Sequence, residues 1–178
     1  MVSDVNIVKT GRLLIRYINT EDAKFMLDLF NEPDWIKYIG DRGIRTKDAM
    51  KTYIEDGPMT MYKEYGIGLY AVELKEKGIP IGICGLIHRD FLKDVDLGFA
   101  FLSKYWGKGY AYEATNAILK YGAEELGYRR VVAFTSLTND KSANLLLKLG
   151  MKDEGLIKFV STAEDMRLFV IDSTLAAN

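Results

Sequence analysis

The sequence contains a single cysteine, Cys84, and a single histidine, His88. A lone cysteine cannot form a disulfide within the chain, which favours a reducing compartment and predicts a cytoplasmic protein. One cysteine and one histidine also fall short of the nitrogen and sulfur ligands of a usual zinc site, so no metal centre is expected. Because Cys84 stands among apolar residues in a strand-like segment, we expect it to be a small buried thiol with a structural role.

Long apolar runs and a strong excess of either charge are also missing. No stretch approaches the roughly 18 apolar residues of a membrane span, and residues 1–11 lack the apolar run of a signal peptide. The 24 basic and 25 acidic residues leave a net charge of −1, which argues against nucleic-acid binding through a basic stripe. The 178-residue chain shows no repeat or linker and is expected to form one domain over residues 1–178.

The pattern of apolar, capping and turn residues predicts eleven elements in the order β-α-α-β-β-β-α-β-α-β-β. The expected strands span 12–17, 69–74, 81–88, 95–102, 130–137, 152–159 and 166–171, and the expected helices span 21–31, 47–56, 109–126 and 139–149. Thr20 and Thr46 are the expected N-caps of the first two helices, which Pro33 and Gly57-Pro58 are expected to end.

The order of these elements indicates an α/β fold. Strand–helix–strand units in the second half imply some parallel pairing, whereas the central strands read as antiparallel. We therefore expect an αβα sandwich around a central mixed, largely antiparallel sheet of about seven strands.

Two glycines stand where the fourth predicted strand passes into the third predicted helix, in the run Tyr105-Trp106-Gly107-Lys108-Gly109-Tyr110-Ala111-Tyr112-Glu113-Ala114. Glycine lets backbone amides approach a phosphate without an intervening side chain. The start of the helix adds unpaired N–H groups and the positive end of the helix dipole. This combination indicates a site for the pyrophosphate of a large cofactor, although a tight turn before a helix would use the same glycines.

The spacing of this loop excludes the two common nucleotide motifs. A Walker A loop needs Lys and Ser or Thr after its second glycine, where this chain has Tyr110-Ala111. A dinucleotide loop needs a third glycine three positions after Gly109, where this chain has Tyr112. The expected phosphate ligand is therefore neither a P-loop nucleotide nor a Rossmann dinucleotide.

The loop resembles that of the GNAT N-acetyltransferase superfamily, in which the acetyl-CoA loop follows Q/R-x-x-G-x-G/A. The corresponding residues are Trp106-Gly107-Lys108-Gly109-Tyr110-Ala111, with Trp106 in place of Gln or Arg. The likeness is greatest to the ribosomal-protein (RimJ/RimL-like) branch, where W-G-K-G-Y-A followed by E-A is common. Further segments that match this branch, in its order, are Thr10-x-Arg12-Leu13-x-Ile15-Arg16, Ile81-Gly82-x-x-Gly85-Leu86, Asn139-x-x-Ser142 and Lys148-Leu149-Gly150.

The resemblance implies direct transfer of an acetyl group from acetyl-CoA to a primary amine, without an acyl-enzyme. The acceptor would be a protein N-terminal α-amine, with polyamines, amino acids and antibiotics as the small-molecule alternatives. A catalytically silent acyl-CoA-binding module is the alternative outside enzymes. A homodimer is expected only because other members of the family form dimers.

The resemblance also assigns roles along the cofactor. The strand before the loop would part from its neighbour, so that the backbone at Phe99 and Phe101 pairs with the pantetheine arm. Independently of the resemblance, Lys108 would either add positive charge beside the phosphates or be a solvated surface lysine. Asn139 would contact the pantetheine arm, and Ser142 would lie near the sulfur and protonate the departing thiolate. The alternative for Asn139 and Ser142 is ordinary capping of a helix.

Asp96 occupies a position where many members of the superfamily carry a glutamate that takes the proton of the amine, often through water. Side chains alternate between the two faces of its strand. The face that carries Asp94, Asp96, Gly98 and Ala100 is interpreted as the wall of a cavity or as a solvent face. A cationic amine must lose a proton before it attacks, which a nearby carboxylate can relay. In the first half, Trp35, Tyr38, Tyr62 and Tyr65, with Asp34 and Asp41, either line the acceptor site or serve packing.

Overall fold

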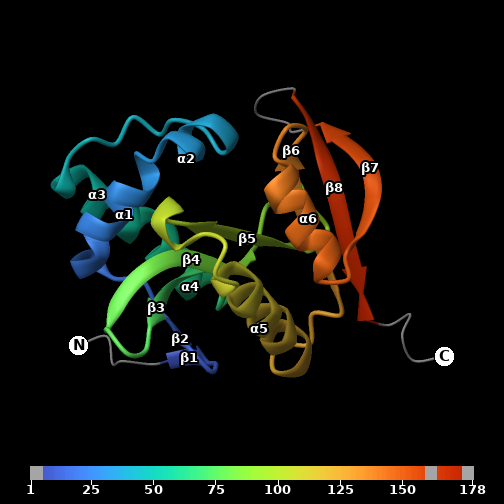
Figure 1. The fold of residues 1–178 in the computed structure, drawn as a ribbon, viewed down its shortest axis with the longest axis horizontal. Helices are drawn as coiled ribbons and strands as arrows, with labels where there is room; N and C mark the ends of the chain where they lie inside the picture. Colours follow the sequence, from blue (N-terminus) through green and yellow to red (C-terminus); the bar gives the residue numbers. More distant parts are fainter. Residues whose placement is uncertain (1–5, 159–163, 174–178) are drawn as a thin grey trace.

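The computed structural model describes residues 6–158 and 164–173. Its strands form one sheet in the order β1-β2-β3-β4-β5-β6-β8-β7, in which β5 and β6 are parallel and the other neighbours are antiparallel (Figure 1). The strands are Asn6–Lys9 (β1), Leu13–Arg16 (β2), Leu69–Leu74 (β3), Ile79–Ile87 (β4), Val95–Phe101 (β5), Arg130–Ser136 (β6), Lys152–Lys158 (β7) and Asp165–Asp172 (β8). The predicted mixed, largely antiparallel sheet is confirmed, with β1 as a strand that the sequence did not indicate.

Helices cover both faces of the sheet, as expected (Figure 1). They are Ala23–Phe30 (α1), Pro33–Tyr38 (α2), Lys47–Ile54 (α3), Thr60–Tyr65 (α4), Tyr110–Glu124 (α5) and Asp140–Lys148 (α6). On one face, Met26 of α1 and Met50 of α3 pack in one buried cluster with Ile83 of β4. On the other face, Ile118 of α5 and Leu146 of α6 share a second cluster with the strands. The two helical layers thus belong to the two halves of the chain.

The start of the first helical segment and the role of Pro33 differ from expectation. Asn19, not Thr20, provides the cap, because the Oδ1 atom of Asn19 accepts the N–H of Glu21 at 2.8 Å. α1 ends at Phe30, and Pro33 then opens α2 as its first residue. Proline suits that position because the first helical N–H has no partner within the helix.

The second predicted helix extends past the point where Gly57-Pro58 was expected to end it. Thr46 is the N-cap, as predicted, and its Oγ1 atom accepts the N–H of Ala49 at 3.2 Å. After α3 the chain makes a π-helical turn over Glu55–Met59 and continues as α4. Gly66 ends α4 in the left-handed conformation at φ +71°, which glycine adopts readily. The π-turn accommodates Pro58 without ending the helical path.

The predicted closing hairpin is present, and β8 lies between β6 and β7. Phe159, the last residue of the predicted strand 152–159, lies outside the described residues. Within the described ranges, no helix is long and apolar enough to cross a membrane. The same residues hold no group of three or more His, Cys, Asp or Glu side chains arranged to bind a metal ion.

The close approach of β3 and β4 makes Gly85 a sensitive position. A Cβ atom built on Gly85 would lie 1.9 Å from the carbonyl oxygen of Gly68, so that Gly85→Ala forces the backbone apart. We expect this substitution to lower the free energy of unfolding by about 2–3 kcal/mol, at the upper end for overpacking. Gly57→Ala is the matched control, because its nearest neighbour would be an atom of the Tyr53 ring at 3.9 Å. Equal urea midpoints for the two variants would contradict the prediction.

Candidate active site

The strands β5 and β6 part soon after they meet. Both span seven residues, yet they pair only at Val95–Val131 and Asp96–Val132. On its other side β5 stays paired with β4 as far as Phe101, which faces Gly82. The N–H of Leu102 donates to the carbonyl of Ile81 at 3.0 Å. Because these groups alternate along a strand, the backbone groups of Phe99 and Phe101 point away from β4, toward the side where β6 has departed.

This orientation agrees with what was predicted for Phe99 and Phe101, whose contact with a pantetheine arm stays a prediction. One of these backbone groups already has a partner, because the indole Nε1 of Trp106 donates to the carbonyl oxygen of Phe101 at 2.8 Å. A carbonyl oxygen has a second lone pair, so the bond does not exhaust that acceptor. The ammonium of Lys141, in the first turn of α6, lies 4.6 Å from the centre of the Trp106 ring. Trp106 therefore connects the end of β5 with the start of α6.

The loop after β5 presents backbone donors at the start of α5. Gly107 and Gly109 adopt the left-handed conformation, at φ +72° and +79°. Gly109 is the N-cap of α5, and among the described residues no side chain caps this end. The first hydrogen bond of the helix runs from the N–H of Glu113 to the carbonyl of Gly109 at 3.0 Å. The N–H groups of Tyr110-Ala111-Tyr112 precede that bond, so they have no acceptor within the helix and fit a pyrophosphate.

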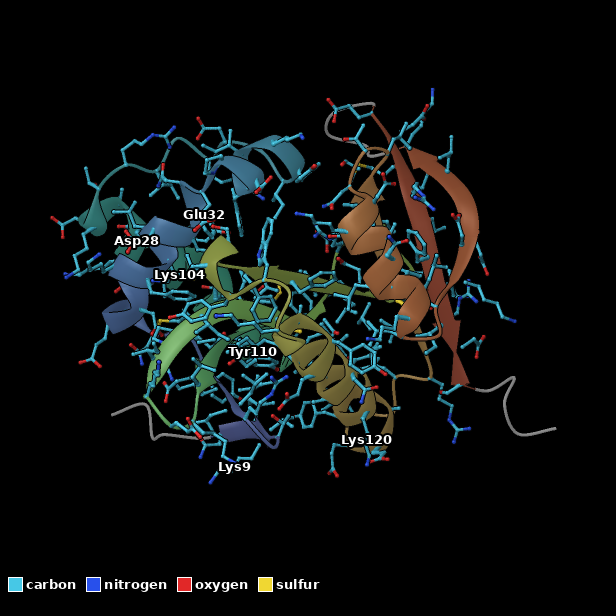
Figure 2. The ribbon with its side chains drawn as sticks, in the orientation of Figure 1. Lys9, Asp28, Glu32, Lys104, Tyr110 and Lys120 are labelled. Atoms are coloured by element: carbon cyan, nitrogen blue, oxygen red, sulfur yellow. The ribbon has the colours of Figure 1, made fainter. Side chains whose placement is uncertain are left out.

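Neighbouring elements hold this loop in place. A single 3-10 turn, Ser103–Tyr105, follows β5, and the Oε2 atom of Glu32 accepts the N–H of Ser103 at 3.1 Å. Glu32 is the N-cap residue of α2, so the exit of β5 is fastened to the first helical layer. Figure 2 shows Tyr110 at the start of α5, with Lys104 and Glu32 beyond it toward α1. Tyr110 also contacts Tyr105, with ring centres 6.5 Å apart.

Asp96 lies in a more enclosed place than a cavity wall would give it. Only 2% of Asp96 is exposed, and Arg89 contacts both of its oxygens, with Nε–Oδ1 at 2.7 Å and Nη2–Oδ2 at 3.3 Å. Burial raises the pKa of the Asp96 carboxyl above its ordinary value, and the hydrogen bond and charge of Arg89 oppose that rise. A base buried in this way can reach an amine through water more readily than by direct contact.

The small residue next along this strand has a packing reason. A Cβ atom on Gly98 would lie 2.8 Å from Cδ1 of Ile87 and 3.1 Å from Cδ2 of Leu69. Ala100 packs against the cluster that contains the first-half helices. The interpretation of this face as an open cavity wall is therefore wrong at Gly98, where neighbouring side chains fill the space.

Asn139 caps α6, as one of the two sequence interpretations expects. Its Oδ1 atom accepts the backbone N–H of Ser142 at 3.2 Å. Ser142 is half-buried in the first turn of the helix, next to Lys141, which contacts Trp106. The structure thus brings the start of α6 to the glycine loop. The contacts of Asn139 and Ser142 with a cofactor, and the role of Lys108 beside its phosphates, stay predictions.

Most of the first-half aromatic side chains serve packing. Trp35 is 7% exposed and stacks on Phe30, with ring centres 4.0 Å apart. Tyr62 stacks on Tyr70 at 5.5 Å in the core. Tyr65 stacks on the His88 ring at 4.2 Å, which places the only histidine in a surface contact.

Cys84 is fully buried, and burial raises the pKa of its thiol. The prediction of a small buried thiol is confirmed.

Three functional candidates escaped the sequence-based prediction: Arg89, Arg12 and Glu113. The Nε atom of Arg12 lies 2.7 Å from Oε2 of Glu113, and its Nη1 donates to the carbonyl of Lys108 at 2.8 Å. Arg12 and Glu113 each stood inside a recognised motif, but nothing in the sequence links residues so far apart. Arg89 lies across the β4–β5 turn from Asp96, and a basic residue before a turn is too common to be a signal.

The comparisons with known proteins agree with this geometry. The family model for the acetyltransferase (GNAT) domain matches residues 12–152. The uncharacterized N-acetyltransferase YnaD of Bacillus subtilis (strain 168) is 30% identical over 156 residues, or 85% of each chain. A GNAT-family acetyltransferase from Bacillus anthracis has a TM-score of 0.78 at 26% identity, over 94% of this chain and 98% of its own. The ribosomal-protein-S5-alanine acetyltransferase from Vibrio fischeri shares the fold, with a TM-score of 0.78 at 22% identity over 96% of this chain and 97% of its own. The chain belongs to the GNAT acetyltransferase family and is an N-acetyltransferase with acetyl-CoA as its co-substrate.

Proposed function

We propose that this protein transfers the acetyl group of acetyl-CoA directly to the α-amine of a protein N-terminus. The observation that carries the transfer is the parting of β5 and β6 beside the uncapped first turn of α5. A pantetheine arm along β5 and a pyrophosphate on the N–H groups of 110–112 would set the thioester between Asp96 and Ser142. The enzyme then needs no acyl intermediate, and the fully buried Cys84 takes no part.

The chain supplies two proton-transfer groups for this reaction. Acetyl-CoA supplies an activated thioester, whose C–S bond breaks as the new C–N bond forms. Asp96 accepts the proton of the attacking amine through water, since the carboxylate is buried and hydrogen-bonded to Arg89. Ser142 donates a proton to the departing thiolate and recovers one from solvent. General acid and base groups of this kind each contribute about 10²–10⁴-fold to a rate.

The charge pattern supports a singly charged acceptor. A polyamine site needs several acids with no cationic partner, and three acids of the first-half helices and their loops are already paired, which leaves fewer for such a site. Asp28 contacts Lys24 at 2.8 Å, Asp41 contacts Arg45 at 2.6 Å, and Asp48 contacts Lys51 at 3.7 Å. Asp96 is likewise paired, with the guanidinium of Arg89 at 2.7 Å, so it is not a free acid for a second ammonium group.

A panel of amines tests the proposal. Purified protein is given acetyl-CoA with peptides that have a free or a blocked N-terminus, with spermidine, and with single amino acids, and release of free CoA is followed. We expect the highest kcat/KM with peptides that have a free α-amine, and none with the blocked ones. Preference for spermidine would reject the acceptor assignment, and CoA binding without turnover of any amine would reject catalysis.

A further inference from the structure

A cluster of hydrogen bonds joins the turn before β2 to the first turn of α5. Glu113 lies at its centre: Oε1 accepts the hydroxyl of Thr10 at 2.6 Å and the N–H of Arg12 at 2.9 Å, while Oε2 accepts Nε of Arg12 at 2.7 Å. Thr10 is itself fixed by its turn, because its Oγ1 atom accepts the N–H of Leu13 at 3.0 Å. We refer to Thr10, Arg12 and Glu113 as the clamp.

The clamp reaches the glycine loop through the second arm of the Arg12 guanidinium. Nη1 donates to the carbonyl of Lys108 at 2.8 Å, and the Arg12 guanidinium carbon lies 4.4 Å from the centre of the Tyr110 ring. A Cβ atom on Gly109 would lie 3.3 Å from Nη2 of Arg12, so the residue at 109 must leave space for the guanidinium. Arg12 is therefore packed directly against the loop.

The bond to Lys108 sets the direction of the following amide. The C=O and N–H groups of a trans peptide point in opposite directions, and no peptide bond of the described residues is cis. Because Arg12 holds the carbonyl of Lys108, the N–H of Gly109 points away from Arg12. The clamp thus keeps a carbonyl dipole on one side of the loop and exposes a donor on the other, beside the unpaired N–H groups of α5.

The clamp also compensates a charge that would oppose the cofactor. Glu113 lies in the first turn of α5, where a carboxylate suits the helix dipole but repels a pyrophosphate on the same turn. The guanidinium of Arg12 pairs with Glu113 and presents a fork that a lysine cannot reproduce. One side chain thereby orients the loop and neutralises its nearest acid.

We propose that Arg12 and Glu113 are positioning residues for the pyrophosphate of acetyl-CoA, acting through the carbonyl of Lys108 and the first turn of α5. This inference rests on the proposed placement of the cofactor on the glycine loop. The proposal assigns a function to the Arg12–Glu113 pair, which joins two motifs that are distant in the sequence. Neither strand formation nor helix formation requires this pair.

The test compares acetyl-CoA with S-acetylpantetheine, which carries the same thioester but no pyrophosphate. Arg12→Gln is expected to raise the KM for acetyl-CoA about five-fold at unchanged kcat, the fold-change equivalent of one net hydrogen bond. The same variant should leave kcat/KM with S-acetylpantetheine at the wild-type value. Arg12→Lys should fail to restore the KM, and Glu113→Gln should raise it in the same direction. Arg130→Gln is the control, because Arg130 also pairs with an acid, Asp94 at 3.0 Å, at the opposite end of β5.

Each outcome decides between the alternatives. Equal losses of kcat/KM with acetyl-CoA and with S-acetylpantetheine would make the clamp merely structural. An Arg12→Gln variant with no loss would overturn the proposal, and so would full recovery of the KM in Arg12→Lys. Calorimetric Kd values for CoA and pantetheine give the same comparison without an acceptor amine. If the wild type binds CoA but acetylates nothing, the proposed function fails, while the calorimetric ratio still decides on the clamp. A wild type that binds no CoA would overturn both. Melting temperatures identify any variant that fails to fold.

Discussion

Replacing Asp96 with Asn is expected to lower kcat/KM at pH 7 by at least about ten-fold, as loss of a general base does. The substitution keeps the size of the side chain and an acceptor oxygen for Arg89, but it removes the proton acceptor. An α-amine has a pKa near ~8, so most of it is cationic at pH 7 and depends on a base. Above that pH the amine is already neutral. The deficit of Asp96→Asn should therefore shrink when kcat/KM is measured at pH 9.

Asp94→Asn is the matched control for this experiment. Asp94 lies next to β5 and also pairs with an arginine, Arg130, at 3.0 Å. Its replacement removes an acid from the same end of the strand without touching the proposed relay, and kcat/KM should stay at the wild-type value. A wild-type rate in Asp96→Asn, with an unchanged melting temperature, would remove Asp96 from the mechanism.

A substitution of Arg89 tests the role of Asp96 independently, through the pKa of its carboxyl. Burial raises the pKa of the Asp96 carboxyl, and Arg89 opposes that rise through its hydrogen bond and charge. Arg89→Gln removes the opposing influence, so the pKa of Asp96 should rise further. Because the base acts as a carboxylate, the low-pH limb of kcat/KM is expected to move to higher pH. A limb that stays in place would mean that another group titrates there.

The order of strands and helices was predictable because it depends on local patterns. Alternating apolar residues mark the central strands, and the caps at Thr46 and Asn139 act within a single helical turn. β1 was not predicted because its four residues are half-buried or exposed and show no clear alternation of apolar and polar side chains. The π-helical turn at Glu55–Met59 was not predicted because proline normally ends a helix, whereas here the helical path continues through a buried Pro58.

The glycine loop could be located from the sequence for the same local reason, since positive φ angles at Gly107 and Gly109 require that residue type. The partners of the site could not. Arg12 meets Glu113 only when the sheet brings the turn before β2 under α5, and Arg89 meets Asp96 only across a turn. Motifs therefore marked both ends of the clamp without revealing that they touch.

Ser142→Ala isolates the second proposed proton-transfer group without disturbing the helix that carries it. Asn139 caps α6 through the backbone N–H of Ser142, which alanine retains, and alanine is a good helix former. We expect an unchanged melting temperature and a fall in kcat of about ten-fold, with little change in the KM for acetyl-CoA. The effect falls below the usual range for a general acid because a thiol that titrates near ~8.5 leaves readily even without help.

Asn139→Ala tests the other role of this turn, the capping of α6, through stability and not through rate. Loss of the cap is expected to cost about 1 kcal/mol of stability, since the N–H of Ser142 loses its acceptor.

Ser142→Thr retains a hydroxyl and should recover most of the rate lost in Ser142→Ala. If Ser142→Ala turned over acetyl-CoA at the wild-type kcat, the hydroxyl would have no part in catalysis. The Asn139–Ser142 turn would then be a cap alone, and solvent would have to protonate the thiolate.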